Sequence, residues 1–534
     1  MLRGLALGMI SGFTTHKVYC APHTTAAAGN DDEDDGVIIR MPGGKNKPET
    51  AESNAQAVDV AEEDTIPVDP VKAVVVGGGF AGGKLSQLFD SIFDVTLVDS
   101  KNFLEFAPDL VPILCSEWTQ TSEEALKKSL TLHRFYLKRA NVVTGKGTSI
   151  VDDGKALLLE DGRRVPFDLV VLTTGAQRAF PYATERRTLR QRAEEIKFMN
   201  QFIAKDCERI AIVGAGPMGA STASFLAQTY PNKQIDLFTS GPTVLPSLPR
   251  QAREKGADIM SYHKNLNIHL NATVTEVERV AGEEGLIAKP SLMDRILGRQ
   301  KRRFVGLKDT FDLRVEKRAG GSIVVNSVLK QWWFGLPPSS KVVGAHVAST
   351  ETFSGYDYVF NCGGVTPNND TFSSDPTLGP HLRADGKFRV STLQQLLGHV
   401  NIFAVGNANA LPFQKSYSNV NVEARSLFRN FYGVVSSTDP ENVKTMEGNG
   451  LTPSRMQLPR ILLALGPDDA VGSTAWGGSV VGYQAQSELI QERVHLINGF
   501  VQPIFYKPHD PIKVRSVFDK WREKEVTDVA DFVN

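Results

Sequence analysis

Two glycine-rich turns carry the residue types and the spacing that bind the phosphates of a dinucleotide. The first reads Gly-Gly-Gly-Phe-Ala-Gly at residues 77–82, and the second reads Gly-Ala-Gly-Pro-Met-Gly at residues 214–219. In such a turn the first glycine permits a tight bend, the second lets the backbone approach a pyrophosphate, and the third lets the following helix pack closely. One turn alone would be weak evidence, but two of the same design predict a chain that holds two dinucleotides.

The first turn comes with the elements that must position it. Residues 71–76 form a β-branched run, typical of a strand buried on both faces of a parallel sheet. The strand expected at residues 94–98 stops at Asp99, whose carboxylate would accept hydrogen bonds from ribose hydroxyls. A plain strand-to-helix turn without a ligand is the alternative. The predicted binding residues are Gly77, Gly79, Phe80, Ala81, Gly82 and Asp99.

The second turn is less complete. Residues 209–214 predict its strand and residues 220–229 its helix. The next strand, at residues 234–238, ends in Thr239 and Ser240, where an acid would favour NAD and an arginine NADP. The nucleotide preference stays open, as does a unit that no longer binds a nucleotide. The predicted binding residues here are Gly214, Gly216 and Gly219.

Later segments would return the chain to these turns. Residues 167–176 predict a buried strand ending in Thr-Thr-Gly, where Gly175 would let the backbone pass close to a cofactor. Residues 356–368 repeat that pattern after the second turn, and residues 399–410 predict one further strand. A helix is expected to start near Lys415. Residues 140–164 predict short strands, whereas the prolines and aromatics of residues 102–112 predict a loop under the ligand.

Composition excludes several classes of function. A formal net charge of −1 argues against a nucleic-acid-binding surface, so no nucleic acid is expected as a partner. The four cysteines, Cys20, Cys115, Cys207 and Cys362, are scattered without any Cys-X-X-Cys pair. Neither a zinc cluster nor a local redox-active disulfide is therefore predicted, and the ten histidines show no metal-binding spacing.

The N-terminal region predicts a targeting peptide followed by a linker, together residues 1–70. The first 30 residues contain Arg3 and Lys17, no acid, and an apolar stretch at residues 5–13 that is shorter than the roughly 20 residues of a membrane span. A mitochondrial presequence is the favoured interpretation. A secretory signal or an unprocessed tail is the alternative, with a cytoplasmic or membrane-associated location. The acidic stretch at residues 30–69 predicts a disordered linker.

Further motifs reveal a family resemblance. They are Thr-Val-Leu-Pro-Ser-Leu-Pro-Arg at residues 243–250, Ala-Val-Gly-Asn at residues 404–407, and the stretch at residues 461–472. With the paired turns, they resemble the FAD- and NAD(P)-binding flavoproteins of the pyridine nucleotide-disulphide oxidoreductase type. The nearest group is the apoptosis-inducing-factor-2-like proteins, which include ferroptosis suppressor protein, and type II NADH dehydrogenases come next. The resemblance runs from residue 71 to residue 509, with one insertion.

The resemblance implies a fold and a reaction. The fold would be α/β, with two Rossmann-like dinucleotide-binding domains of the glutathione-reductase type. A discontinuous FAD domain, residues 71–204 and 356–435, would enclose an NAD(P)H domain at residues 205–355, and a small C-terminal cap or acceptor region would follow at residues 436–534. Hydride would pass from NADH or NADPH through FAD to a quinone or other small acceptor at a membrane surface.

Two positions depart from that family. Gly406 is followed by Asn407, where the family usually has Gly-Asp, so an amide would meet the ribityl chain of FAD. Ser221 stands two residues beyond the third glycine of the second turn, where the family tends to carry Glu near the nicotinamide. These departures favour an alternative function, a flavin-binding interaction or redox-sensing protein with a degenerate nicotinamide site. A flavin enzyme that reacts with oxygen is a further alternative. No catalytic acid or base is predicted.

The insertion, at about residues 285–340, is strongly basic. Residues 289–318 carry ten Lys or Arg against four Asp or Glu, and Trp332 and Trp333 follow. A solvated charged loop whose indoles pack into the second domain is the favoured interpretation. Peripheral contact with an anionic membrane, which cations beside exposed indoles would suit, is the alternative.

Overall fold

The computed structural model describes residues 69–280, 309–319, 322–325, 340–343, 346–411, 415–436, 462–473, 479–482, 485, 489 and 509–533. Three expectations lie largely or wholly outside these ranges. They are the targeting peptide with its acidic linker, most of the basic insertion, and the pair Trp332 and Trp333.

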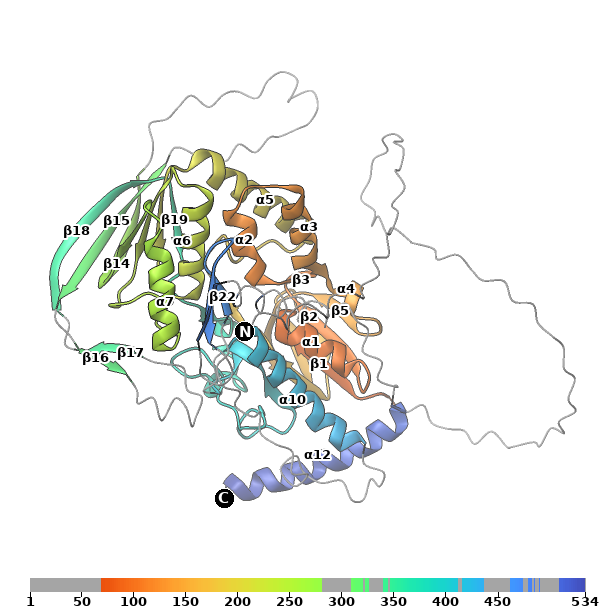
Figure 1. Cartoon of the computed structure of the whole chain (residues 1–534). Coiled ribbons are helices and arrows are strands. Elements are labelled where there is room, and N and C mark those ends of the chain that lie inside the picture. Colours follow the sequence, from red (N-terminus) through yellow and green to blue (C-terminus); the bar gives the residue numbers. More distant parts are fainter. Residues whose placement is uncertain are drawn as a thin grey trace, which may run out of the picture. The chain divides into compact units, whose positions relative to one another are not determined.

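The first sheet is parallel and takes its strands from two distant parts of the chain (Figure 1). Its order is β21-β9-β1-β2-β5, and each neighbouring pair runs parallel. The strands are β1 (Lys72–Val76), β2 (Asp94–Asp99), β5 (Asn141–Thr144), β9 (Leu169–Leu172) and β21 (Ile402–Ala404). Because β21 pairs with β9 only after the second sheet has been completed, the first domain is discontinuous, as predicted from the sequence.

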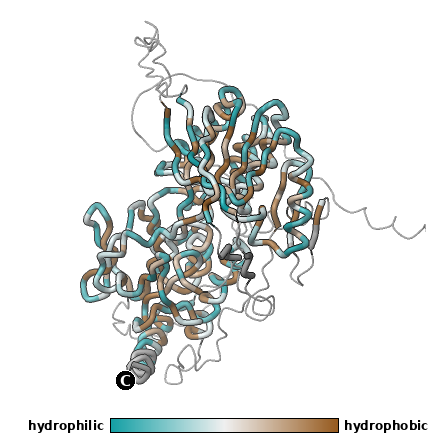
Figure 2. Tube along the Cα trace, turned by 90° about the vertical axis from the view of Figure 1, so that its left-hand side faces the viewer, coloured by the Kyte–Doolittle hydropathy of each residue, from teal (hydrophilic) through white to brown (hydrophobic). Residues whose placement is uncertain are grey.

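Both faces of the first sheet are covered, which explains its uninterrupted apolar strands. Alternate side chains of a strand point to opposite faces. Ala73 and Val75 of β1 pack in one core with α1 (Phe80–Phe89) and α10 (Tyr417–Val435). Val74 and Val76 pack in another with the antiparallel strands β6 (Gly147–Val151), β7 (Ala156–Leu159) and β8 (Arg164–Pro166). In Figure 2, hydrophobic residues are concentrated along the inner parts of the chain trace.

The second sheet repeats this arrangement. Its parallel order is β13-β12-β11-β19, from β11 (Arg209–Val213), β12 (Gln234–Phe238), β13 (Leu266–His269) and β19 (Tyr358–Asn361). Ile210 and Ile212 join the core formed with α5 (Leu189–Asp206), α6 (Pro217–Thr229) and α7 (Arg250–Ser261). Ala211 lies on the opposite face, in a separate core with Leu313 and Val315. The predicted fold class, two Rossmann-like domains with a discontinuous first domain, is confirmed.

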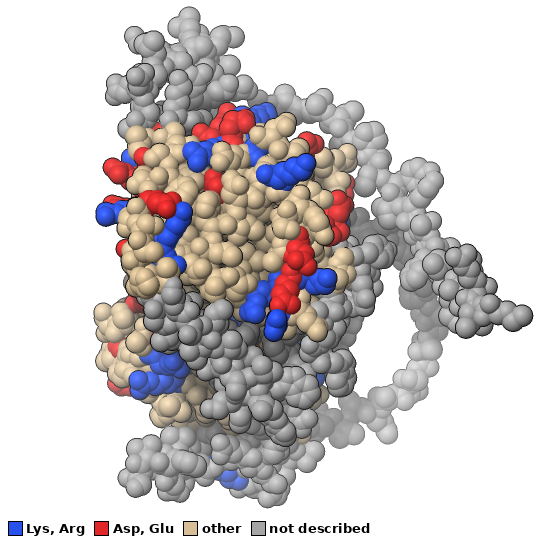
Figure 3. Space-filling model, turned by 60° about the vertical axis from the view of Figure 1, so that its left-hand side comes forward, with Lys and Arg blue, Asp and Glu red and all other residues tan. Residues whose placement is uncertain are grey.

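The antiparallel layer of the second domain carries mixed charge on its surface. It consists of β14 (Ala272–Val280), β15 (Thr310–Ala319) and β18 (His346–Tyr356), and a separate antiparallel pair is formed by β16 (Ser322–Val325) and β17 (Ser340–Val343). Lys317 pairs with Glu351 at 2.6 Å across β15 and β18, and Arg279 pairs with Asp309. Figure 3 shows acidic and basic side chains in small mixed groups on the face drawn there. The described part of this layer therefore presents paired charges.

The two returning segments lie side by side. β10 (Ala176–Gln177) pairs antiparallel with β20 (Thr366–Pro367). The Thr174 hydroxyl donates to Oδ1 of Asn369 at 2.5 Å, while Nδ2 of the same fully buried asparagine donates to the carbonyls of Gly386 and Ala408. Asn369 thus ties the end of the first returning segment to the last part of the first domain.

The predicted loop at residues 102–112 is wrong, because this segment is regular. It contains β3 (Phe103–Glu105), which pairs with β4 (Leu130–Leu132), then the 3-10 turn η1 (Ala107–Asp109) and the helix α2 (Leu110–Cys115). Pro112 lies in the first turn of α2, where its missing N–H removes no helical hydrogen bond. The apolar residues of α2 are buried in the core shared with α5 and α6. Tertiary packing therefore outweighs the local proline signal.

The C-terminal region contains a small sheet and a long helix that the sequence did not predict. The sheet comprises β22 (Leu462–Ala464), β23 (Ala470–Ser473) and β24 (Ser479–Val481). The helix α12 (Pro511–Val533) buries Phe518 and Trp521 in the core of the first domain, and Arg515 pairs with Asp168 at 2.7 Å. The sequence also predicts a helix at residues 483–497, and this segment lies largely outside the described residues. None of the helices in the described ranges has both the length and the apolar composition needed to cross a membrane.

Asp236, a buried carboxylate of β12, predicts a pH dependence of stability. Burial alone would raise the pKa of Asp236, but hydrogen bonds from His269, Asn267 and Tyr356 outweigh it and hold the pKa below its usual range. Its stabilising contribution is therefore present above the unfolded-state pKa of about 3.9 and is lost as the pH falls through the lower folded-state value. We expect Asp236→Asn to lower the free energy of unfolding at pH 6 by on the order of 1 kcal/mol. Urea unfolding should show that the difference in free energy of unfolding between the wild type and the variant becomes smaller towards pH 3. A difference that grows there would contradict the lowered pKa of Asp236.

Candidate dinucleotide-binding sites

The first glycine turn joins β1 to α1 in a conformation that excludes other residue types. Gly77 has φ +104°, and its N–H donates to the carbonyl of Val98 at 2.7 Å. A Cβ on Gly77 would lie 2.5 Å from the carbonyl oxygen of Thr173. A Cβ on Gly82 would lie 1.9 Å from the carbonyl oxygen of Gly77. The first and third glycines are therefore required by the backbone itself.

The middle glycine differs, because it faces open space. Gly79 is the N-cap of α1, and a Cβ there would meet nothing in the described chain within 4 Å. Phe80 and Ala81, both buried, begin the helix. The first N–H groups of a helix have no partner inside it, and together with the helix dipole they attract an anion. The turn thus fits a pyrophosphate that approaches the backbone at Gly79.

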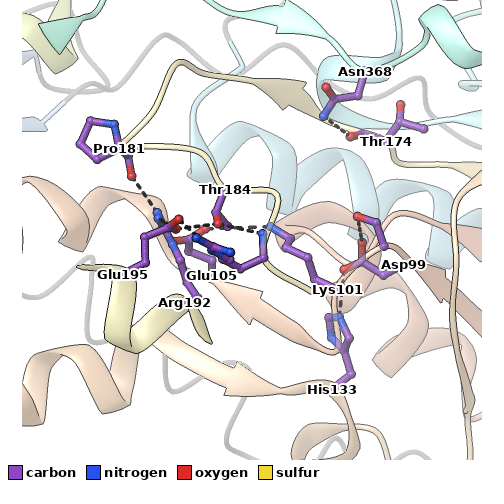
Figure 4. A network of polar contacts seen from close by, with 12 residues as sticks. Asp99, Lys101, Glu105, His133, Thr174, Pro181, Thr184, Arg192, Glu195 and Asn368 are labelled. Carbon is purple, nitrogen blue, oxygen red and sulfur yellow. Dashed lines mark hydrogen bonds and ion pairs between the residues drawn. The ribbon is translucent and has the colours of Figure 1, made fainter. Parts of the chain in front are cut away.

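Asp99 lies beside this turn, as the sequence predicts, but one of its oxygens is already engaged. Its Oδ2 lies 3.0 Å from Nε2 of the fully buried His133 (Figure 4). Nδ1 of His133 lies 2.7 Å from the Tyr136 hydroxyl. With Nε2–H donating to Asp99 and Nδ1 accepting from the Tyr136 hydroxyl, all three groups have hydrogen-bond partners. The other carboxylate oxygen, Oδ1, lies 3.5 Å from the Ser100 hydroxyl and is the one suited to a ribose hydroxyl.

His133 and Gly78 are site residues that reasoning from the sequence missed. A Cβ on Gly78 would lie 2.4 Å from Oδ2 of Asp99 and 2.5 Å from the His133 ring. The glycine turn, the acid and the histidine therefore occupy one tightly packed volume. The only signal for this packing in the sequence was the glycine at position 78, because the Gly-X-Gly-X-X-Gly motif does not require a glycine there.

The returning segments complete the first site. Gly175 and Gly406 both have positive φ, +71° and +72°. A Cβ on Gly406 would lie 3.5 Å from Cβ of Ala81, so this turn, η4 (Gly406–Ala408), sits against the start of α1. Asn407 in the same turn is half-buried. The structure therefore brings η4 up to the first glycine turn, although the two lie far apart in the chain.

The helix expected near Lys415 begins at Tyr417, with the Ser416 hydroxyl accepting a hydrogen bond from the N–H of Asn419. The Tyr417 ring lies 5.0 Å from that of Phe80 and 5.1 Å from that of Phe106, measured between centroids. The N-termini of α1 and α10 are therefore neighbours, and the positive ends of two helix dipoles meet at the first site.

The second turn reproduces the first. Gly214 has φ +101°, and its N–H donates to the carbonyl of Phe238 at 2.8 Å. A Cβ on Gly214 would lie 2.7 Å from the carbonyl oxygen of Cys362. A Cβ on Gly219 would lie 1.8 Å from the carbonyl oxygen of Gly214. Gly216, the N-cap of α6, again faces open space. Two turns with the same contacts and the same opening are thus present.

The residues that follow β12, Thr239 and Ser240, and Ser221 in α6 are uncharged. The Thr239 N–H donates to the carbonyl of His269 at 3.0 Å, and its hydroxyl accepts a hydrogen bond from the N–H of Gly241. Ser240 is exposed, whereas Ser221 is buried within α6 at 5% exposure. Ser221 therefore presents little polar surface to a ligand.

A buried ionic cluster supports the connection between the two domains (Figure 4). Arg192 on α5 is fully buried and donates to Glu105 of β3 and to Glu195, each at 2.8 Å. It also donates to the carbonyl of Pro181 at 2.8 Å. The guanidinium of Arg192 thus connects the segment that follows β10, the helix α5 and the strand β3. Among the described residues, no group of three or more His, Cys, Asp or Glu side chains could hold a metal ion.

The fold and the two turns define an α/β protein with two Rossmann-type dinucleotide-binding domains. Residues 71–330 match the model of the pyridine nucleotide-disulphide oxidoreductase family, so the chain contains a domain of that family.

Two curated relatives and one solved structure extend this finding. The chain is 22% identical over 410 residues to ferroptosis suppressor protein 1 of Taeniopygia guttata, covering 75% of this chain and 88% of that protein. It is 21% identical over 403 residues to apoptosis-inducing factor homolog B of Dictyostelium discoideum, covering 75% and 88%. Its fold is similar to that of NDH2 from Plasmodium falciparum in complex with NADH, with TM-score 0.56, 12% identity, and coverage of 86% and 98%. The resemblance found in the sequence is confirmed.

Proposed function

We propose that the protein is a FAD-dependent oxidoreductase that takes hydride from NADH or NADPH and delivers electrons to a quinone or another small acceptor. The observation that carries this proposal is the pair of equivalent glycine turns, each opening at its middle glycine, Gly79 or Gly216. A chain with a single cofactor would need only one such opening. The solved structure of similar fold, NDH2 from Plasmodium falciparum, is in complex with NADH, which supports a nicotinamide nucleotide in one of the two sites.

The first site is the one suited to FAD. Its pyrophosphate would lie at Gly77, Gly79 and Gly82, its adenosine ribose at Asp99, and its ribityl chain at Asn407. This assignment is supported by the packing of η4 against Ala81 and by the carboxylate oxygen of Asp99 that His133 leaves available. When bound, FAD supplies a carrier that accepts two electrons from a nicotinamide and releases them to a second substrate.

The side chains around the first site would orient the bound group and exclude water. Phe80, Phe106 and Tyr417 form an aromatic wall where the two helix N-termini meet. The N–H groups at those termini favour negative charge that develops on a bound ligand. The hydride step itself needs no side chain as an acid or a base, because it depends mainly on the relative placement of donor and acceptor.

The second site would hold NADH or NADPH at Gly214, Gly216 and Gly219. At the end of β12, Thr239 and Ser240 provide neither the acid that selects NADH nor the arginine that binds a 2′-phosphate. We therefore expect both nucleotides to serve, with no strong preference between them.

The free cysteines of the described chain support a small molecule, rather than a disulfide, as the electron acceptor. Cys115, Cys207 and Cys362 are free thiols in the described part of the chain. Burial raises the pKa of Cys207 and of Cys362 to about 12, so both remain protonated and are poor nucleophiles. Electrons would then leave the flavin directly, and the resemblance to ferroptosis suppressor proteins and type II NADH dehydrogenases favours a quinone. Peripheral membrane contact by the basic insertion is proposed from its excess of Lys and Arg and from Trp332 and Trp333.

A second function is favoured by Ser221, which is buried where the family tends to carry a glutamate. The protein would then keep FAD as a structural group and act as an interaction or redox-sensing protein.

Turnover assays separate these functions. The purified protein should oxidise NADH or NADPH several-fold faster with a soluble quinone than with oxygen alone. Equal rates with and without quinone would identify an oxidase. A yellow protein that oxidises neither nucleotide would identify the non-enzymatic alternative.

A further inference from the structure

A buried carboxylate, Glu423, lies directly behind the turn that would meet the ribityl chain. It is 1% exposed and belongs to α10. Its Oε2 accepts hydrogen bonds from the N–H of Gly406 and from Nδ2 of Asn409, each at 3.0 Å. Asn409 is itself fully buried, and its Nδ2 also donates to the carbonyl of Ala404 at 2.9 Å. The carboxylate therefore anchors both ends of η4.

The other oxygen of Glu423 binds a buried cation. Lys415 Nζ donates to Oε1 of Glu423 and to Oδ1 of Asn409, each at 2.7 Å. Burial lowers the pKa of Lys415, against the opposing effect of the Glu423 carboxylate. Lys415 directly precedes Ser416, the N-cap of α10, so its charge adds to the positive end of the helix dipole.

A buried ion pair is a poor source of stability, because removing both charges from water costs about as much as their attraction returns. This pair lies between the start of α10 and the turn at Gly406, next to Asn407. That turn packs against the start of α1, where Cβ atoms at Gly406 and Ala81 would be 3.5 Å apart. Position 407 carries an amide instead of the acid that the family usually has there. The negative charge beside the turn η4 is therefore carried by Glu423 on α10, behind the turn.

We propose that Glu423 supplies the negative charge that position 407 lacks, by holding η4 in place for the ribityl chain and by balancing Lys415 at the flavin. This inference rests on the proposed binding of FAD at the first site. Glu423 acts here as a positioning residue, since its oxygens are occupied by Gly406, Asn409 and Lys415. Its charge and that of Lys415 should act in opposite directions on the reduction of the flavin, which adds negative charge to the ring.

Two single variants test the charge balance. Glu423→Gln removes the carboxylate that contacts Lys415, so the reduction potential of bound FAD should become more positive. Lys415→Met leaves Glu423 uncompensated, so the potential should become more negative. Titration against reference dyes measures both, and Glu254→Gln, which removes a charge from an exposed ion pair on α7, is the matched control with an unchanged potential. A merely structural role would not give shifts of opposite sign.

A charge swap tests the relation to position 407. Glu423→Gln should weaken FAD binding to the apoprotein on the order of tenfold, through loss of hydrogen bonds to a charged group. Asn407→Asp alone should also weaken binding, because it places a second carboxylate beside Glu423. The double variant Asn407→Asp/Glu423→Gln should bind FAD more tightly than either single variant. Titration of the apoprotein by the quenching of flavin fluorescence gives these affinities.

The outcomes distinguish this inference from the proposed function. A wild-type protein that binds FAD, together with a Glu423→Gln variant of unchanged affinity and potential, would overturn the role of Glu423 alone. Potential shifts of the same sign in the Glu423 and Lys415 variants would overturn it too, as would a double variant no better than Glu423→Gln. If Glu423→Gln does not fold, the reduction potential of the Lys415→Met variant still tests the charge balance, because only a more negative potential agrees with it. A wild-type protein that binds no FAD would contradict the proposed function and this inference with it.

Discussion

Gly216→Ala is expected to weaken NADH and NADPH binding by about tenfold to a hundredfold while leaving FAD binding and stability unchanged. The added methyl group would enter open space in the protein, so it disturbs no packing. That same space is where the pyrophosphate must approach the backbone. The rate of flavin reduction as a function of nucleotide concentration gives the affinity, and thermal unfolding gives the stability.

Gly79→Ala is the matched control, because it makes the same change in the first turn. It should weaken FAD binding and leave the affinity for the nicotinamide nucleotide unchanged. Gly219→Val completes the comparison. Its Cβ would lie 1.8 Å from the carbonyl oxygen of Gly214, so it should destabilise the protein by about 3 kcal/mol. If Gly216→Ala lowered stability as much as Gly219→Val, or left nucleotide affinity intact, the assignment of the second site would be wrong.

Arg192→Met is expected to lower the free energy of unfolding by about 3–5 kcal/mol. The substitution leaves Glu105 and Glu195 partly buried without the guanidinium that each contacts at 2.8 Å (Figure 4). It also leaves the carbonyl of Pro181 without its donor. Urea unfolding followed by circular dichroism measures the change.

Arg190→Met on the same helix is the control. Arg190 is 89% exposed and pairs with the exposed Glu194, so its loss should change the free energy of unfolding by less than about 0.5 kcal/mol. Similar values for the two variants would show that the buried cluster contributes no more than a surface ion pair.

Local patterns in the sequence predicted most of the fold. The apolar runs before Gly77 and Gly214 are strands because both faces of each sheet are covered, and covered strands read as continuous apolar runs. The strand at residues 234–238 was predicted to the residue, since Thr239 marks its polar end. Gly77, Gly82, Gly214 and Gly219 are recognisable because backbone contacts at these positions leave no space for a Cβ. Each of these features depends on residues close together in the chain.

What the sequence did not predict depends on distant contacts. Asp99 meets His133, 34 residues away, and Glu423 meets the N–H of Gly406 through the return of α10. Nothing local at residues 110–115 predicts a helix, because its stability comes from burial against α5 and α6. The ligand roles of all predicted site residues remain predictions.

The central claim is that one bound flavin accepts hydride from a nicotinamide nucleotide and passes its electrons to a quinone. Its most direct test is an anaerobic titration of the purified wild-type protein, followed by flavin absorption. We expect a yellow protein that NADH or NADPH bleaches without any acceptor and that a quinone then returns to yellow. A yellow protein that neither nucleotide bleaches would contradict hydride transfer, and a colourless protein would contradict the FAD site itself.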